Sequence, residues 1–84
     1  MKKLKISLKD ASLIDQAFEK LVSKYSDLSP NTEDGVRIDF NEGWVHMRKS
    51  NTEPIVRIFS ESDTQINADK IALDIEKEIN DLVN

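Results

Sequence analysis

Cysteine is absent from the sequence, and histidine and tryptophan each occur once. Without cysteine the chain can form neither a disulfide framework nor a thiolate metal site, which is compatible with a reducing compartment. No apolar run approaches the roughly 20 residues that a membrane span needs. The basic residues 1–5 lack the apolar stretch of a secretory signal. We therefore expect a cytoplasmic protein that has no membrane partner.

Positive charge is also in the minority. The chain has 12 Lys and Arg residues against 16 Asp and Glu residues, for a formal net charge of -4. This balance opposes non-specific attraction to nucleic acid, so we expect no nucleic-acid partner, and an anion site would have to be local. Hydrophobic residues make up 38% of the chain, which is typical of a folded, soluble unit. At 84 residues we predict a single domain, residues 1–84, with a thin core.

Two segments repeat apolar residues at steps of three and four, which predicts two amphipathic helices. Asp10 or Ser12 is available as N-cap of the first helix, and Thr64 or Asn67 as N-cap of the second. The apolar stripes consist of Leu13, Ile14, Ala17, Phe18, Leu21, Val22 and Tyr25, and of Ala68, Ile71, Ala72, Ile75, Ile79, Leu82 and Val83.

Four segments alternate polar and apolar residues, as strands with one buried face do. They are residues 3–8, 36–40, 44–48 and 54–61, and the second and third form a predicted hairpin around Asn41-Glu42-Gly43. Residues 26–35 are predicted to be a loop. The fold class is therefore α+β, with a four-stranded, mainly antiparallel sheet, two helices on one face and the order β-α-β-β-β-α.

The richest concentration of hydrogen-bond donors lies between the last two predicted strands. Arg48 offers a planar fork that can meet two oxygens of a phosphate. Ser50 and Thr52 can donate from hydroxyls, Asn51 from its amide, and successive backbone N–H groups can form a concavity that holds an anion. A polar stretch of this kind is more often only a turn. The segment reads Arg48-Lys49-Ser50-Asn51-Thr52-Glu53-Pro54.

Residues near this segment are predicted either to support the site or to have a purely structural role. Ionised Glu53 cannot donate to a phosphate, so we predict that it holds Arg48 or Arg57 in place. Arg57 could reach the phosphate, pair with Glu53 or face solvent, and strand alternation leaves these three open. His46 and Trp44 are interpreted as packed or surface positions of a strand, outside the site.

Residues 48–58 resemble the phosphate-binding loop of the C-terminal, or fourth, domain of the phosphoglucomutase/phosphomannomutase (alpha-D-phosphohexomutase) family. The resemblance continues upstream through residues 34–40 and 43–48, and downstream through residues 59–61 into the final helix. The first strand and helix fit the layout of that domain without a matching motif. The implied fold is like that of the TATA-box-binding protein.

The resemblance implies a part in an isomerase of carbohydrate metabolism, which moves a phosphoryl group within a hexose phosphate by way of a phosphoserine. The fourth domain of such enzymes grips the phosphate that is not being transferred. Carried over, the phosphate-binding residues are Arg48, Ser50, Asn51 and Thr52, with Glu53 and Arg57 in support. The implied partners are a hexose phosphate and the remaining domains of the parent enzyme.

The sequence resembles neither the serine nucleophile loop nor the aspartate-rich magnesium loop of these enzymes. We therefore predict no catalytic residue, no metal ligand and no cofactor in this chain, and no activity in isolation. The parent enzyme would use Mg²⁺ and a hexose bisphosphate. Asn51 stands where phosphoglucosamine mutases have glycine, which favours the phosphoglucomutase or phosphomannomutase type. The alternative function is a stand-alone protein-interaction module that uses the open sheet face or an edge strand.

Overall fold

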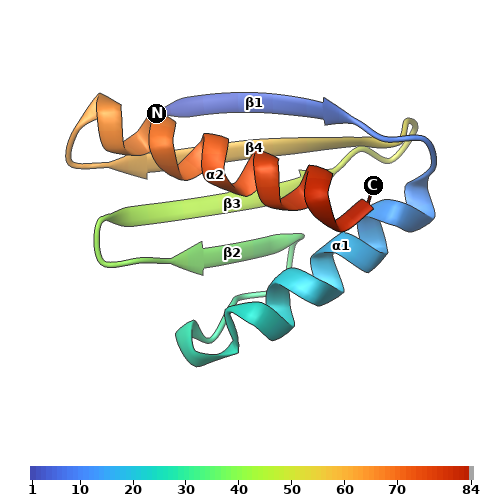
Figure 1. Ribbon diagram of the computed structural model, residues 1–84, viewed down its shortest axis with the longest axis horizontal. Helices are drawn as coiled ribbons and strands as arrows, with labels where there is room; N and C mark the ends of the chain where they lie inside the picture. Colours follow the sequence, from blue (N-terminus) through green and yellow to red (C-terminus); the bar gives the residue numbers. More distant parts are fainter. Residues whose placement is uncertain (84) are drawn as a thin grey trace.

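The computed structural model describes residues 1–83 and has the predicted order of elements (Figure 1). The elements are β1 (Lys2–Ser7), α1 (Ala11–Lys24), a short 3-10 helix η1 (Ser26–Leu28), β2 (Val36–Asp39), β3 (Gly43–Lys49), β4 (Ile55–Ser62) and α2 (Gln65–Val83). Each strand differs from its predicted bounds by one residue at one end or at both. The predicted loop 26–35 contains η1, and β4 begins one residue after Pro54, which has no N–H to offer a ladder.

The four strands form one sheet in the order β1-β4-β3-β2, and every neighbouring pair is antiparallel. β4 therefore lies in the interior of the sheet, between the first strand of the chain and the hairpin strand β3. In the register, Arg57 of β4 lies opposite Lys5 of β1 on one side and opposite Arg48 of β3 on the other. The predicted hairpin and antiparallel sheet are confirmed.

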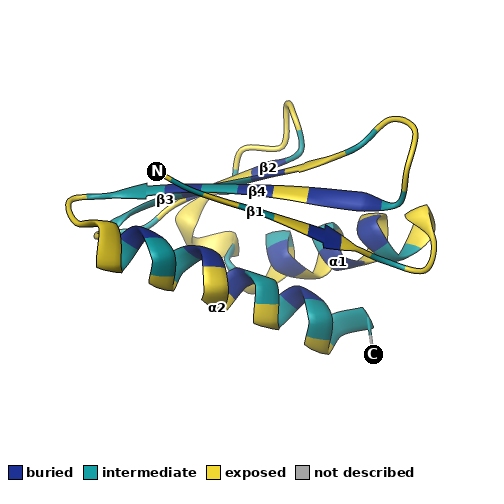
Figure 2. Ribbon diagram, turned by 90° about the horizontal axis from the view of Figure 1, so that it is seen from above, coloured by how far each residue is buried: buried dark blue, intermediate teal, exposed yellow. Residues whose placement is uncertain are grey.

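Both helices cover the same face of the sheet (Figure 2). The core lies between these two layers, because alternate strand residues and one stripe of each helix are buried there. Its fully buried members include Ile14, Leu21, Ile38, Val45, Met47, Val56, Ile58, Ala72 and Ile79. The predicted α+β architecture, with helices on one face and an open face opposite, is confirmed.

Each helix begins with a side-chain cap. Asp10 caps α1, since its Oδ1 accepts from the Ser12 N–H at 2.7 Å, and the hydrogen bonds from the Ser12 hydroxyl and N–H lower the pKa of the Asp10 carboxyl. At α2, Thr64 Oγ1 accepts from the Asn67 N–H at 3.1 Å. Asp10 and Thr64 thus fill the capping positions for which the sequence left two candidates each. Within residues 1–83 neither helix is both long and apolar enough to cross a membrane.

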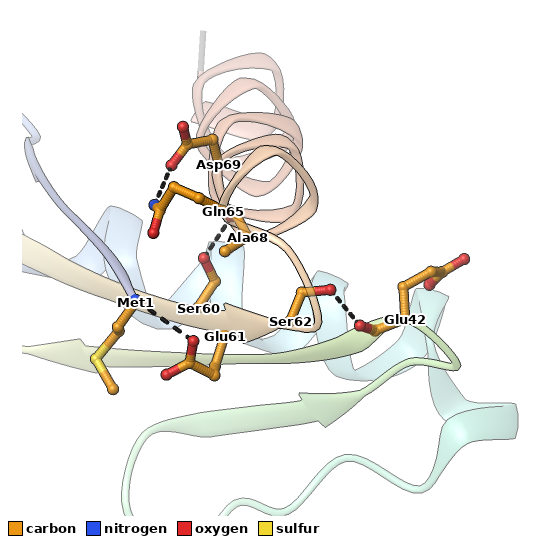
Figure 3. A network of polar contacts seen from close by, with 8 residues as sticks. All are labelled: Met1, Glu42, Ser60, Glu61, Ser62, Gln65, Ala68 and Asp69. Carbon is orange, nitrogen blue, oxygen red and sulfur yellow. Dashed lines mark hydrogen bonds and ion pairs between the residues drawn. The ribbon is translucent and has the colours of Figure 1, made fainter.

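The end of β4 is tied to its surroundings by polar contacts (Figure 3). Ser60 is fully buried, and its hydroxyl donates to the Ala68 carbonyl at 2.6 Å, which pins the first turn of α2 to the sheet. The Ser62 hydroxyl donates to the Glu42 carbonyl in the hairpin turn. Glu61, between these two serines, points away from α2 and pairs with the Met1 amino group at 3.4 Å.

Candidate functional site

Residues 50–54 connect β3 to β4 in a tight loop. The Ser50 N–H donates to the Ile55 carbonyl at 2.9 Å, and the Ile55 N–H donates to the Glu53 carbonyl at 2.8 Å. Inside the loop the Thr52 N–H donates to Ser50 Oγ at 3.3 Å, and the two hydroxyl oxygens of Ser50 and Thr52 lie 3.5 Å apart. These contacts bring the two predicted hydroxyl donors side by side.

The loop is also anchored to β1, the edge strand beside β4. The Pro54 carbonyl accepts from the Leu8 N–H at 2.8 Å, just beyond the end of β1. Pro54 also restricts the residue before it to extended geometry. The base of the loop is therefore held from both β3 and β1 before any ligand arrives.

The tip of the loop presents donors to solvent. Asn51, Thr52 and Glu53 are exposed. Among the hydrogen bonds of residues 1–83, none is donated by the backbone N–H groups of Asn51 and Glu53. These amides, with the Asn51 side chain and the two hydroxyls, are available to an anion outside the loop.

Arg48 lies on β3, one residue before its end, and projects from the open face of the sheet. Its Nε lies 3.3 Å from Asp34 Oδ2, and 54% of the Arg48 side chain and 66% of the Asp34 side chain are exposed. An ion pair this exposed contributes about 0 to 1 kcal/mol. A ligand phosphate could therefore replace Asp34 as the partner of Arg48 at small cost.

Asp34 is the residue of this site that the sequence did not reveal. The sequence predicts only a loop over residues 26–35, and it names Glu53 as the residue that holds Arg48 or Arg57 in place. In the structure the Asp34 carboxylate faces Arg48, while the Asp34 carbonyl lies 2.6 Å from Nε2 of His46. The β2–β3 pairing brings this turn beside Arg48.

Glu53 and Arg57 occupy different surroundings. Arg57 is exposed on the open face directly opposite Arg48, so the two guanidinium groups share one face beside the loop. Within residues 1–83 neither Glu53 nor Arg57 makes an ion pair. Their supporting roles stay predictions.

The other candidates have structural surroundings. Lys49 points to the helix side and its Nζ lies 2.9 Å from Asp15 Oδ1 on α1, away from Arg48 as strand alternation predicts. Trp44 is half-buried, and the Arg37 guanidinium carbon lies 4.6 Å from the centroid of its ring. Among the described residues 1–83 no three His, Asp or Glu side chains are grouped so as to hold a metal ion.

The arrangement can therefore hold a small dianion at the end of the β3–β4 hairpin. The guanidinium of Arg48 would supply charge, and the hydroxyls and amides of residues 50–53 would supply directed hydrogen bonds. All of these donors lie on a surface that is open to solvent. A ligand gripped here would remain accessible on its other sides.

Comparison with known proteins finds relatives that are named as sugar-phosphate mutases. Residues 3–78 match the family model described as phosphoglucomutase/phosphomannomutase, C-terminal domain. The chain is 34% identical over 77 residues to a phosphoglucosamine/phosphogalactosamine mutase of Sulfurisphaera tokodaii, which covers 89% of this chain and 17% of that protein. It is 39% identical over 72 residues to a phosphoglucomutase of Neisseria gonorrhoeae, covering 81% of this chain and 15% of that protein.

A shorter stretch is more similar still. A phosphoglucomutase/phosphomannomutase of Thermococcus kodakarensis is 53% identical over 38 residues, 45% of this chain and 8% of that protein. The chain thus spans less than a fifth of the length of these relatives. Their names include both glucosamine and glucose or mannose mutases, so the preference drawn from Asn51 stays a prediction.

Proposed function

Because the chain belongs to the phosphoglucomutase/phosphomannomutase C-terminal domain family, we propose that it binds the phosphate of a hexose phosphate. In this proposal Arg48, Ser50, Asn51 and Thr52 grip the phosphoryl group that is not transferred. The remaining domains of a parent mutase would supply the nucleophile, the Mg²⁺ site and most of the contacts to the sugar. This domain alone would not catalyse the reaction.

The observation that carries the proposal is the exposed cluster of donors at the β3–β4 connection. Arg48 has only an exposed carboxylate partner, and the amides of Asn51 and Glu53 donate no hydrogen bond within residues 1–83. A phosphate dianion would satisfy these groups together. Pinning of the loop by Leu8 and Ile55 supports the proposal, since a pre-ordered loop loses less entropy on binding.

Affinity should be low, because one wall of the pocket cannot surround a sugar phosphate. We expect a dissociation constant of about 1 mM, or roughly -4 kcal/mol. In the mechanism, this weak grip would hold one end of the substrate while the other end reacts elsewhere in the enzyme. Weak binding would also allow the bisphosphorylated sugar to be released, to reorient and to bind again with its other phosphate in this site.

The test is a titration of the isotopically labelled domain with glucose 1-phosphate, followed through backbone amide shifts. We expect saturable shifts centred on residues 48–54. Arg48→Ala should weaken binding by about 10-fold or more, since a charge-assisted hydrogen bond contributes roughly 1.5 to 3 kcal/mol.

Arg37→Ala is the matched control, because Arg37 is also an exposed strand arginine paired with a single aspartate, Asp39. It should leave the affinity unchanged. Equal affinities of the wild type and Arg48→Ala would overturn the proposal, as would shifts that centre on any other part of the chain.

A further inference from the structure

The open face of the sheet, opposite the helices, is much more basic than the rest of the chain. On its strands this face carries five of the chain's 12 Lys and Arg residues but only two of its 16 Asp and Glu residues, and Asp34, in the turn before β2, adds one carboxylate beside Arg48. The charged and aromatic residues of the open face are Lys3 and Lys5 of β1, Arg57, Phe59 and Glu61 of β4, Trp44, His46 and Arg48 of β3, and Arg37 and Asp39 of β2. A net positive surface thus exists on a chain of net charge -4.

The acidic side chains on and beside this face already have partners, including Asp34, which pairs with Arg48. Asp39 lies 3.2 Å from Arg37, and Glu61 pairs with the Met1 amino group (Figure 3). By contrast, Lys3, Lys5 and Arg57 make no ion pair within residues 1–83. Three adjacent cations are therefore left without counter-charges from the fold.

The arrangement of these cations costs stability. The register places Lys5, Arg57 and Arg48 directly opposite one another on three neighbouring strands, about 4.8 Å apart from strand to strand. Like charges directly opposite on one face are destabilising. Arg48 already has Asp34 as a counter-charge, so an acidic partner laid across Lys5 and Arg57 would turn the remaining repulsion into attraction.

The aromatic residues of the open face favour a polypeptide over a nucleic acid as the partner. Single-stranded nucleic acids need free ring faces on which bases can stack. Here the Arg37 guanidinium lies over the Trp44 ring. Trp44, His46 and Phe59 are all half-buried, so the face offers no fully exposed ring to a base.

We propose that the open face binds an acidic segment of another protein, with Lys3, Lys5 and Arg57 as the main contacts to its carboxylates. Carboxylates at alternate positions of an extended chain lie about 7 Å apart. Long lysine and arginine side chains on neighbouring strands can reach such a spacing. The proposal does not rest on phosphate binding, because its test changes Lys3 and Lys5 of β1, neither of which is among the predicted phosphate-binding or supporting residues.

The test uses a fluorescent poly-glutamate peptide at low ionic strength, with binding read by anisotropy and by amide shifts of the labelled domain. We expect shifts on β1 and β4 and affinity that falls with added salt. The variant Lys3→Gln/Lys5→Gln should bind at least about fivefold more weakly. The matched control, Lys20→Gln/Lys70→Gln, removes two exposed lysines from the helix side and should bind like the wild type.

Several results would overturn the proposal. Equal losses in the two double variants would show attraction to the molecule's lysines in general, and shifts on the helices would place the contact elsewhere. Tighter binding of polyuridylate than of poly-glutamate at the same ionic strength would identify a nucleic-acid surface. The two proposals fail separately. Arg48→Ala tests the binding of glucose 1-phosphate, and Lys3→Gln/Lys5→Gln should bind glucose 1-phosphate as the wild type does.

Discussion

At the scale of single residues, the surroundings of Arg48 in the candidate site depend on Gly35. Gly35 has φ +69°, and a Cβ built on it would lie 2.0 Å from the Met47 carbonyl oxygen. Only glycine allows this close approach of the turn to β3. The approach holds the Asp34 carboxylate beside Arg48 and the Asp34 carbonyl beside His46.

Gly35→Ala is therefore expected to lower the free energy of unfolding by at least about 2 kcal/mol, since it adds left-handed strain to a backbone clash. Urea denaturation followed by circular dichroism measures this. The control is Ser29→Gly at another position of positive φ, 52°, where a non-glycine residue is already present. That variant should be neutral or slightly stabilising. A Gly35→Ala protein as stable as the wild type would contradict the role given to this turn.

At the scale of elements, α2 is held at its start by short-range polar contacts and along its length by apolar ones. Thr64 caps the first turn, and the buried Ser60 hydroxyl binds the Ala68 carbonyl. Beyond that turn Ala72, Ile75 and Ile79 are buried against the sheet. Since α2 covers the core, loss of its cap should weaken the whole fold.

Thr64→Ala should destabilise the domain by about 1 kcal/mol, because the Asn67 N–H would lose its acceptor. Thermal and urea unfolding would measure the change. Thr32→Ala is the control, as Thr32 is exposed in the loop before β2. Equal effects of the two substitutions would argue against the cap.

At the scale of the whole molecule, Tyr25 joins parts of the chain that are distant in sequence. Its hydroxyl donates to Glu78 of α2 at 2.7 Å, and its ring contacts Phe40 edge-on with centroids 5.6 Å apart. Burial, followed by the hydrogen bond and the charge of Glu78, raises the pKa of Tyr25 well above its ordinary value of 10.0. Folding therefore favours the protonated phenol.

Because folding raises the pKa of Tyr25, the free energy of unfolding depends on pH. The stabilisation is fully present below pH 10, where Tyr25 is protonated in both states, and is lost as the pH rises toward the folded-state pKa. We expect stability to fall above about pH 10, and less so in Tyr25→Phe. Because the sequence contains one tyrosine, ultraviolet absorbance reports its ionisation directly. A Tyr25 that titrates at its ordinary pKa in the folded domain would contradict the prediction.

The sequence by itself determined the elements of this protein and most of its candidate site. Alternation and helical periodicity are local signals, so the strands, the helices and the loop of residues 50–54 could be predicted to within a residue or two at their ends. The candidate donors to a phosphate could also be named, because they are neighbours in the chain. Residue types at short spacing carried that information.

The tertiary structure alone decided which distant residues meet. The strand order β1-β4-β3-β2 puts Lys5, Arg57 and Arg48 in one row, and the hairpin register puts Asp34 against Arg48. Local patterns say which face a strand residue occupies and which neighbouring strands form a hairpin. They do not say that β1 lies beside β4, or how the turn at residues 34–35 directs its side chains, because these depend on packing of the whole domain. For this reason the partner of Arg48 and the basic row of the open face could be found only in the folded molecule.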